Sequence, residues 1–199
     1  MKFVLASNNA GKIREMRELL SDLHVEVISQ KEAGFFDDVE ETGTTFAENA
    51  EIKARAAHEA LGMGIIADDS GLVVDALHGE PGVYSARYTG NHEDSDEDRY
   101  RFLLKKLEGA EDRSARFVCA ICCILPDGKM ITSSGTCEGD ILYSPQGSGG
   151  FGYDPVFRPE GFKQSMAELG DVKQTISHRS RALEQLKVRL EEYINGIDQ

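Results

Sequence analysis

The feature that most constrains the fold is an apolar run that leads directly into two adjacent carboxylates. Ile65, Ile66 and Ala67 form the run, and Asp68-Asp69-Ser70-Gly71 follows it at once. The run is typical of a buried strand, and we expect it to end at the acids, where hard cations find oxygen ligands. Because consecutive strand side chains point to opposite faces, at least one carboxylate meets interior groups and needs a cation or a lysine as a partner. An Asx turn is the alternative reading.

Other segments carry groups that a phosphate substrate requires. Ser7 to Lys12 joins a predicted strand to a predicted helix, and free N–H groups at a helix start bind anions. The helix dipole disfavours Lys12 in the first turn, so an anionic ligand would resolve the conflict. Lys53 lies on the next predicted helix, and the loop at 40–43 could bring a carboxylate to a metal. A capped turn, surface lysines and an acidic turn are the simpler readings.

The stretch from Gly147 to Pro155 has the most unusual composition in the chain. Its glycines allow close approach of the backbone to a ligand, and Phe151 and Tyr153 could stack on a flat ring. Asp154 could fix the edge of that ring or orient a basic side chain. A flexible loop whose aromatic side chains fill the core is the alternative. Two aromatic residues among glycines favour a lined pocket.

The charge and apolar pattern exclude several classes of protein. Lys and Arg number 22 against 35 Asp and Glu, a formal net charge of −13, which argues against a nucleic-acid binder. Any phosphate site must therefore rely on local cations and backbone N–H groups. No apolar stretch approaches the roughly 20 residues that span a bilayer, and the apolar start is too short for a signal peptide. We expect a cytoplasmic protein without a membrane partner.

The four cysteines are predicted to be buried reduced thiols. Cys119 and Cys122 form a C-x-x-C pair, but alternation along the predicted strand sends them to opposite faces. They therefore cannot share a zinc ion or form a redox pair.

The chain reads as an α/β protein in which a mixed sheet carries helices on its faces. We expect strands at 3–6, 24–28, 65–67 and 72–77, and a hairpin of 117–125 with 130–138. Helices are expected at 11–20, from a capping box at Thr45 to Leu61, from Ser95 to about Leu107, and from Ser177 onward. A second lobe at about 80–145 is compatible with this pattern. Residues 1–199 are expected to form a single functional domain.

Six motifs stand in a recognisable order. They are Ser-Asn-Asn-Ala-Gly-Lys (7–12), Glu-Thr-Gly-Thr-Thr-Phe-Ala-Glu-Asn-Ala (41–50) with Lys53, Ala-Asp-Asp-Ser-Gly-Leu (67–72), Pro-Gly-Val-Tyr-Ser-Ala-Arg-Tyr (81–88), Gly-Phe-Gly-Tyr-Asp-Pro-Val-Phe (150–157) and Ser-His-Arg (177–179). This set closely resembles the house-cleaning purine NTP pyrophosphatases, the inosine triphosphatase or dITP/XTP pyrophosphatase family. Each motif is weak alone, but six in family order, over nearly the whole chain, are highly specific. Relatives often carry Thr in place of Ser7, which keeps the hydroxyl.

The resemblance implies hydrolysis of ITP, dITP and XTP to the monophosphate and pyrophosphate, with Mg²⁺, in a homodimer. It also implies an elongated, two-lobed α/β fold around a long mixed sheet, with the active site in the cleft between the lobes. It makes Asp69 the base and a metal ligand, with Glu41 or Glu40 as the second acid. The substrate contacts that it implies are Ser7, Asn8, Asn9, Ala10, Gly11, Lys12, Lys53, Ser70, Phe151, Gly152, Tyr153, Asp154, Lys173, His178 and Arg179.

The expected reaction is attack of water on the α-phosphorus, with the water activated by Asp69 or by the metal. Lys12, Lys53 and Lys173 would stabilise the charge on the pyrophosphate leaving group. Hydrogen bonds to the 6-keto edge of the base would exclude adenine. Two alternatives remain at this point: a pyrophosphatase for modified pyrimidine nucleoside triphosphates, and a nucleotide-sensing protein without turnover, which would not need the paired acids.

Overall fold

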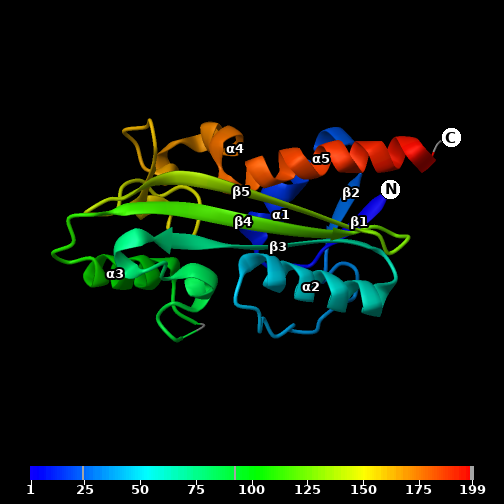
Figure 1. Ribbon diagram of the computed structural model, residues 1–199, viewed down its shortest axis with the longest axis horizontal. Coiled ribbons are helices and arrows are strands. Elements are labelled where there is room, and N and C mark those ends of the chain that lie inside the picture. The colour runs from blue at the N-terminus through cyan, green and yellow to red at the C-terminus, as the bar shows by residue number, and fades with distance from the viewer. Residues whose placement is uncertain (24, 92, 198–199) are drawn as a thin grey trace. The chain divides into compact units, whose positions relative to one another are not determined.

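A mixed sheet flanked by helices forms the framework of the protein. A computed structural model describes residues 1–23, 25–91 and 93–197. The strands in these residues form one sheet in the order β2-β1-β3-β4-β5-β6. Strands β1 to β5 are labelled in Figure 1. β1 pairs in parallel with β2 and β3, whereas β5 and β6 are antiparallel. The predicted α/β class with a mixed sheet is confirmed. The elements are β1 (Lys2–Leu5), α1 (Ala10–Leu19), β2 (Glu26–Ser29), α2 (Phe46–Leu61), β3 (Gly64–Val74), α3 (Asp96–Lys106), β4 (Ser114–Ile124), β5 (Met130–Ile141), β6 (Phe157–Pro159), α4 (Lys173–Ile176) and α5 (His178–Ile197).

The chain divides into two compact units, and strands β3, β4 and β5 each contribute to both. Unit 1 consists of Met1–Asp69, Cys119–Gly135 and Arg179–Gln199, and unit 2 of Ser70–Val118 and Thr136–His178. The second lobe that the sequence suggested at about 80–145 overlaps unit 2, which begins earlier, at Ser70, leaves out residues 119–135 and extends to His178. No helix in the described part of the chain combines the length and the apolar content needed to cross a membrane.

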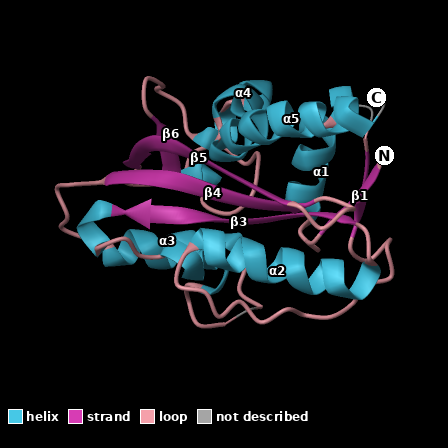
Figure 2. Ribbon diagram, turned by 45° about the vertical axis from the view of Figure 1, so that its right-hand side comes forward, coloured by secondary structure: helices cyan, strands magenta, loops and turns pink. Residues whose placement is uncertain are grey.

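Unit 1 has a hydrophobic core on each face of the sheet. On one face Met16 and Leu20 from the α1 segment and Leu183 and Leu186 from α5 pack against Ile66. On the other face α2 packs through Ala50, Ala54 and Ala57 against Ile65 and Ala67. The view in Figure 2 shows α1 and α5 on one side of the strands and α2 on the other. Alanine side chains bring α2 close to the sheet, as its sequence predicted.

Strand β3 does not end at the paired acids, so this prediction was wrong. It runs without a break from Gly64 to Val74, through Asp68-Asp69-Ser70-Gly71, and joins the two segments expected as separate strands. Asp68 is 1% and Asp69 6% exposed. Continuous alternation places Asp68 on the α1 and α5 face and Asp69 on the α2 face. The strand continues because each carboxylate finds cationic or amide partners on its own face, as described below.

Unit 2 has a core of its own beside the sheet. Leu103 and Leu107, from the α3 segment, pack with Leu72 and Val74 of β3 and Phe117 of β4. The buried ring of Tyr153 belongs to the same core, and its hydroxyl donates to the backbone oxygen of Ser85 at 2.8 Å. This contact ties the loop after β5 to the segment after β3.

Local signals in the sequence set most boundaries correctly. Thr45 and Glu48 form the predicted capping box, and α2 ends at Gly62 in the left-handed conformation. Ser95 and Asp98 form a second capping box at the start of α3. The predicted strand 24–28 is found as β2 over Glu26–Ser29, and His24 lies outside the described residues. All four cysteines are buried thiols, with Cys119 and Cys122 in cores on opposite faces, as predicted.

Candidate active site

Asp68 lies at the centre of a buried ion-pair network in unit 1. Its Oδ2 is 3.0 Å from Lys12 Nζ of α1 and 3.3 Å from Arg179 Nη2 of α5. Arg179 is 1% exposed and also pairs with Glu15, one turn after Lys12. Burial lowers the pKa of Arg179, but Asp68 and Glu15 outweigh that effect and raise it. Asp68 thus holds the helix that carries Lys12, while a contact of Arg179 with substrate stays a prediction.

Asp69 lies in a second cluster on the opposite face of β3. Lys53 Nζ of α2 is 2.8 Å from Glu41 Oε1 and 3.6 Å from Asp69 Oδ1. Asn49, also on α2, donates its Nδ2–H to Asp69 Oδ2 at 3.1 Å. Glu40 is exposed, whereas Glu41 is half-buried and faces the ammonium group. This geometry favours Glu41 over Glu40 as the partner of Asp69.

The environment of Asp69 shifts its proton affinity toward that of a base. Burial raises the pKa of Asp69; the charge of Lys53 opposes this, and the charge of Glu41 adds to it. For Lys53, burial lowers the pKa, but the charges of Asp69, Asp68 and Glu41 together raise it above its ordinary value. A carboxylate with a raised pKa beside a protonated lysine combines a proton acceptor with a phosphate-binding cation.

The segment before α1 forms a capped helix start, and anion binding there stays a prediction. Asn9 caps α1, and its Oδ1 accepts from the Lys12 backbone N–H at 3.0 Å. Ser7 Oγ accepts from the Asn9 N–H at 3.2 Å. Asn8, Asn9 and Ala10 are exposed. The early N–H groups of α1 therefore lie close to the surface, next to the lysine that pairs with Asp68.

The glycine-rich loop in unit 2 is organised by Asp154. Its Oδ2 accepts from the Phe151 backbone N–H at 3.0 Å and lies 2.8 Å from Lys173 Nζ. The same ammonium group lies 4.7 Å from the centre of the Phe151 ring. Gly150 has a φ of +74° and approaches the Asp154 carboxylate so closely that a Cβ would lie 2.0 Å from Oδ2. The loop thus places a half-exposed aromatic ring and a lysine together.

Four further predicted substrate contacts, described next, are buried, half-buried or already bonded within the protein, and their roles stay predictions. Tyr153 is 4% exposed with its ring in the core, so a ligand would meet its backbone rather than its ring face. His178 is 6% exposed and stacks on Phe117 with ring centroids 4.9 Å apart. Ser70 is half-buried in β3, directly after Asp69. The Gly152 backbone N–H donates to Asp96 at 2.7 Å.

The oxygen donors nearest Lys53 are the carboxylates of Glu41 and Asp69, which could also serve a divalent cation. In residues 1–23, 25–91 and 93–197, no group of three or more His, Cys, Asp or Glu side chains is arranged to hold a metal. Glu41 and Asp69 nevertheless already surround one cation, the Lys53 ammonium. Mg²⁺ typically takes one or two carboxylates, with water and substrate phosphates completing its shell. The two carboxylates therefore match what a magnesium ion requires from a protein when other oxygen ligands complete its shell.

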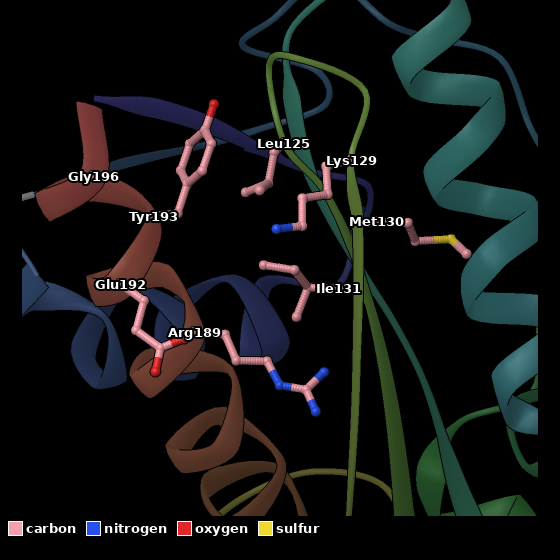
Figure 3. Close-up of a pocket in the computed structure, with 8 residues that line it drawn as sticks. All are labelled: Leu125, Lys129, Met130, Ile131, Arg189, Glu192, Tyr193 and Gly196. Atoms are coloured by element: carbon pink, nitrogen blue, oxygen red, sulfur yellow. The ribbon is translucent and has the colours of Figure 1, made fainter.

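A hollow elsewhere in unit 1 has different chemistry. It has a volume of about 560 Å³ and lies between the β4–β5 turn and α5, where Lys129, Arg189 and Tyr193 line it (Figure 3). Among the described residues that line it, Glu192 alone carries a carboxylate, and Asp68 and Asp69 are not part of it. This hollow is therefore not the site that the motifs predict.

Sequence reasoning missed three residues that organise these clusters: Asn49, Glu15 and Asp96. Asn49 and Glu15 each stand one turn from a predicted lysine on the same helix, at the i+3 or i+4 spacing that places side chains on one face. That spacing was a usable signal for both. Asp96 binds the Gly152 backbone over a separation of 56 residues, for which no local signal exists.

The fold and these clusters define an α/β protein in which a capped helix start carries a lysine paired with one of two adjacent, buried carboxylates. The Ham1 family model matches residues 3–189. The chain belongs to the Ham1 family. A protein of Exiguobacterium sp. named dITP/XTP pyrophosphatase is 47% identical over 197 residues, 98% of this chain and 100% of the relative. A dITP/XTP pyrophosphatase of Desulforamulus reducens is 50% identical over 186 residues, 92% of each chain.

Solved structures agree with this assignment. The Staphylococcus aureus Ham1 protein is 45% identical, with a TM-score of 0.87 over 97% of this chain and 100% of that chain. A nucleoside-triphosphatase / dITP/XTP pyrophosphatase from Mycobacterium abscessus is 42% identical, with a TM-score of 0.76 over 94% of this chain and 98% of that chain.

Proposed function

We propose that the protein hydrolyses non-standard purine nucleoside triphosphates, namely ITP, dITP and XTP, to the monophosphate and pyrophosphate. The observation that carries this proposal is the Asp69 cluster: a buried carboxylate with a raised pKa, a second carboxylate and a protonated lysine on one face of β3. A protein that only senses nucleotides has no need of a buried base. The names of relatives that match nearly the whole chain support the substrate class.

In this proposal Asp69 accepts the proton of the water that attacks the α-phosphorus. Lys12 and Lys53 bind phosphate oxygens and stabilise the charge that moves onto the leaving pyrophosphate. Asp69 and Glu41 would hold Mg²⁺, which when bound would neutralise part of the triphosphate charge. The N–H groups at the start of α1, with Ser7 to Gly11 and Ser70, hold further phosphate and sugar oxygens. Local groups of this kind are required because the whole chain carries a net charge of −13.

We assign recognition of the base to the loop around Phe151, to Lys173 and to His178 and Arg179. Phe151 offers a ring face, while Gly152, Tyr153 and Asp154 line its loop. Lys173 is oriented by Asp154 and is available to a phosphate or a keto oxygen. His178 and Arg179 would donate to the 6-keto edge, which an adenine amino group cannot match. A homodimer and a cytoplasmic location remain predictions.

The test is release of pyrophosphate from ITP, dITP and XTP, with ATP and a modified UTP as competing substrates and with Mg²⁺ present or chelated. We expect Mg²⁺-dependent turnover of the keto purines. In Asp69→Asn turnover should be lost while circular dichroism stays unchanged, and the matched variant of the exposed Asp38, Asp38→Asn, should behave like the wild type. Normal turnover by Asp69→Asn would remove the proposed base, and a preference for the modified UTP would move the protein to the pyrimidine class.

A further inference from the structure

Asn49 links the Asp69 carboxylate to the backbone of the loop that carries Glu41 through a fully buried side chain. It is 0% exposed. Its Nδ2 donates to Asp69 Oδ2 at 3.1 Å, and its Oδ1 accepts from the Gly43 backbone N–H at 2.8 Å. A primary amide is suited to this position because it offers a donor and an acceptor on one short, planar group. Both ends of the Asn49 amide are therefore used.

The hydrogen bond from Gly43 to Asn49 holds the loop that carries Glu41 close to α2. A Cβ at Gly43 would lie 2.6 Å from Asn49 Oδ1 and 2.7 Å from Glu48 Cβ, so only glycine permits the observed approach. Glu41 lies two residues earlier and pairs with Lys53, one turn after Asn49 on α2. The same helical face thus positions the loop, through Asn49, and the ammonium group, through Lys53.

We propose that Asn49 is a positioning residue that sets the separation of the Asp69 and Glu41 carboxylates for a divalent cation. The inference rests on the proposed function, because it takes these two carboxylates as the pair that binds the metal. Asn49 touches neither nucleotide nor metal in this proposal. It orients the Asp69 carboxylate by donating a hydrogen bond to it. It positions Glu41 indirectly, by accepting a hydrogen bond from the backbone N–H of Gly43, two residues after Glu41. Groups that orient metal ligands in this way typically contribute 10-fold to 100-fold to metal affinity or activity.

Two variants break the contact from opposite sides. Asn49→Leu removes both hydrogen bonds while keeping a side chain branched at Cγ, and Gly43→Ala keeps the amide but displaces the loop. We expect each to weaken Mn²⁺ binding to the nucleotide-free protein at least 10-fold, measured by electron paramagnetic resonance titration, and to lower kcat/KM for XTP at least 10-fold. Asn195→Leu, at an exposed position of α5, and Gly196→Ala, where a Cβ meets open space, are the matched controls.

The double variant Asn49→Leu/Gly43→Ala should bind Mn²⁺ no more weakly than the more impaired of the two single variants, because both changes remove the contact between Asn49 and Gly43. A purely structural role of Asn49 would lower Tm and leave the Mn²⁺ affinity of the folded protein unchanged, which would overturn the inference. If Asn49→Leu does not fold, wild-type Mn²⁺ affinity in Gly43→Ala has the same meaning. Loss of turnover in Asp69→Asn together with normal Asn49→Leu and Gly43→Ala refutes only this inference, whereas an active Asp69→Asn refutes the proposed function itself.

Discussion

The two adjacent acids of β3 should respond in opposite ways to the same conservative substitution. Asp68→Asn removes the charge that lies between Lys12 and Arg179, with the side chain of Asp68 0% exposed. Asp69→Asn removes a charge that the folded protein disfavours, because burial raises the pKa of Asp69. We therefore predict that Asp68→Asn destabilises the protein, whereas Asp69→Asn leaves its stability unchanged or increases it.

The size of the first effect follows from the geometry. Removing one partner of a buried ion pair costs about 3–5 kcal/mol. The distances of 3.0 Å to Lys12 and 3.3 Å to Arg179 exceed the roughly 2.7–2.9 Å of the strongest charge-assisted hydrogen bonds. Arg179 also keeps Glu15 as a partner. These facts place Asp68→Asn at the lower end, about 3 kcal/mol, which for a chain of this size lowers Tm by about 6–12 °C.

The sign of the second effect depends on pH. The pKa of Asp69 is higher in the folded than in the unfolded chain, so its ionisation destabilises the fold above that raised pKa. The penalty disappears below the ordinary pKa of aspartate, about 3.9. Any gain in Tm from Asp69→Asn should therefore be present at neutral pH and shrink as the pH falls through the raised pKa.

The assay is thermal unfolding of both variants by circular dichroism, in EDTA so that no metal binds the folded state preferentially. Asp38→Asn, at an exposed position, gives the effect of the amide substitution alone. Two results would refute the assignment of a structural role to Asp68 and a functional role to Asp69. One is a decrease in Tm of less than about 2 °C for Asp68→Asn, and the other is a larger decrease for Asp69→Asn than for Asp68→Asn.

Three further outcomes can be checked directly. Gly150→Ala should lower kcat/KM for XTP at least tenfold, since the new Cβ displaces Asp154; Gly161→Ala, at a φ of +83° with nothing near its Cβ, carries the same backbone strain and should not. Lys173→Met should raise KM for XTP, because it removes the ammonium group that we assign to substrate binding and that Asp154 orients at 2.8 Å; an unchanged KM would show that Lys173 has no such role. Burial raises the pKa of Cys122 to about 11, so below that pH the thiol stays protonated; all four cysteines are buried, and a thiol reagent at pH 8 should modify fewer than one per native chain and all four after unfolding.

Most of the fold could be predicted because its signals are local. The capping boxes at Thr45 and Ser95 and the glycine at position 62 each act within one helical turn, and the structure shows them as expected. The alanine stripe of α2 and the alternation around Cys119 and Cys122 follow from helical and strand periodicity. The division into two units was only partly visible, since β3, β4 and β5 contribute to both and leave no linker in the sequence.

The partners within the candidate site were harder to foresee because they are distant in sequence. The motifs selected Lys12, Lys53 and Asp69, but nothing local indicates that Arg179 faces Asp68 across 111 residues or that Asn49 faces Asp69. The network of Glu15 and Arg179 exists only once α1 and α5 cover the same face of the sheet. Pairing of buried charges is required by their desolvation cost, and the identity of the partner depends on tertiary structure.

The unbroken course of β3 through the paired acids, which the sequence did not predict, explains how the two carboxylates are positioned. Aspartate and glycine have low strand propensity, so Asp68 to Gly71 reads as a strand end. The strand continues because Lys12 and Arg179 on one face, and Lys53 and Asn49 on the other, offset the cost of burying adjacent carboxylates. A turn at this point would leave both acids on a flexible loop. An uninterrupted strand gives each carboxylate a fixed face, so one can anchor α1 and α5 while its neighbour keeps the raised pKa that a base requires.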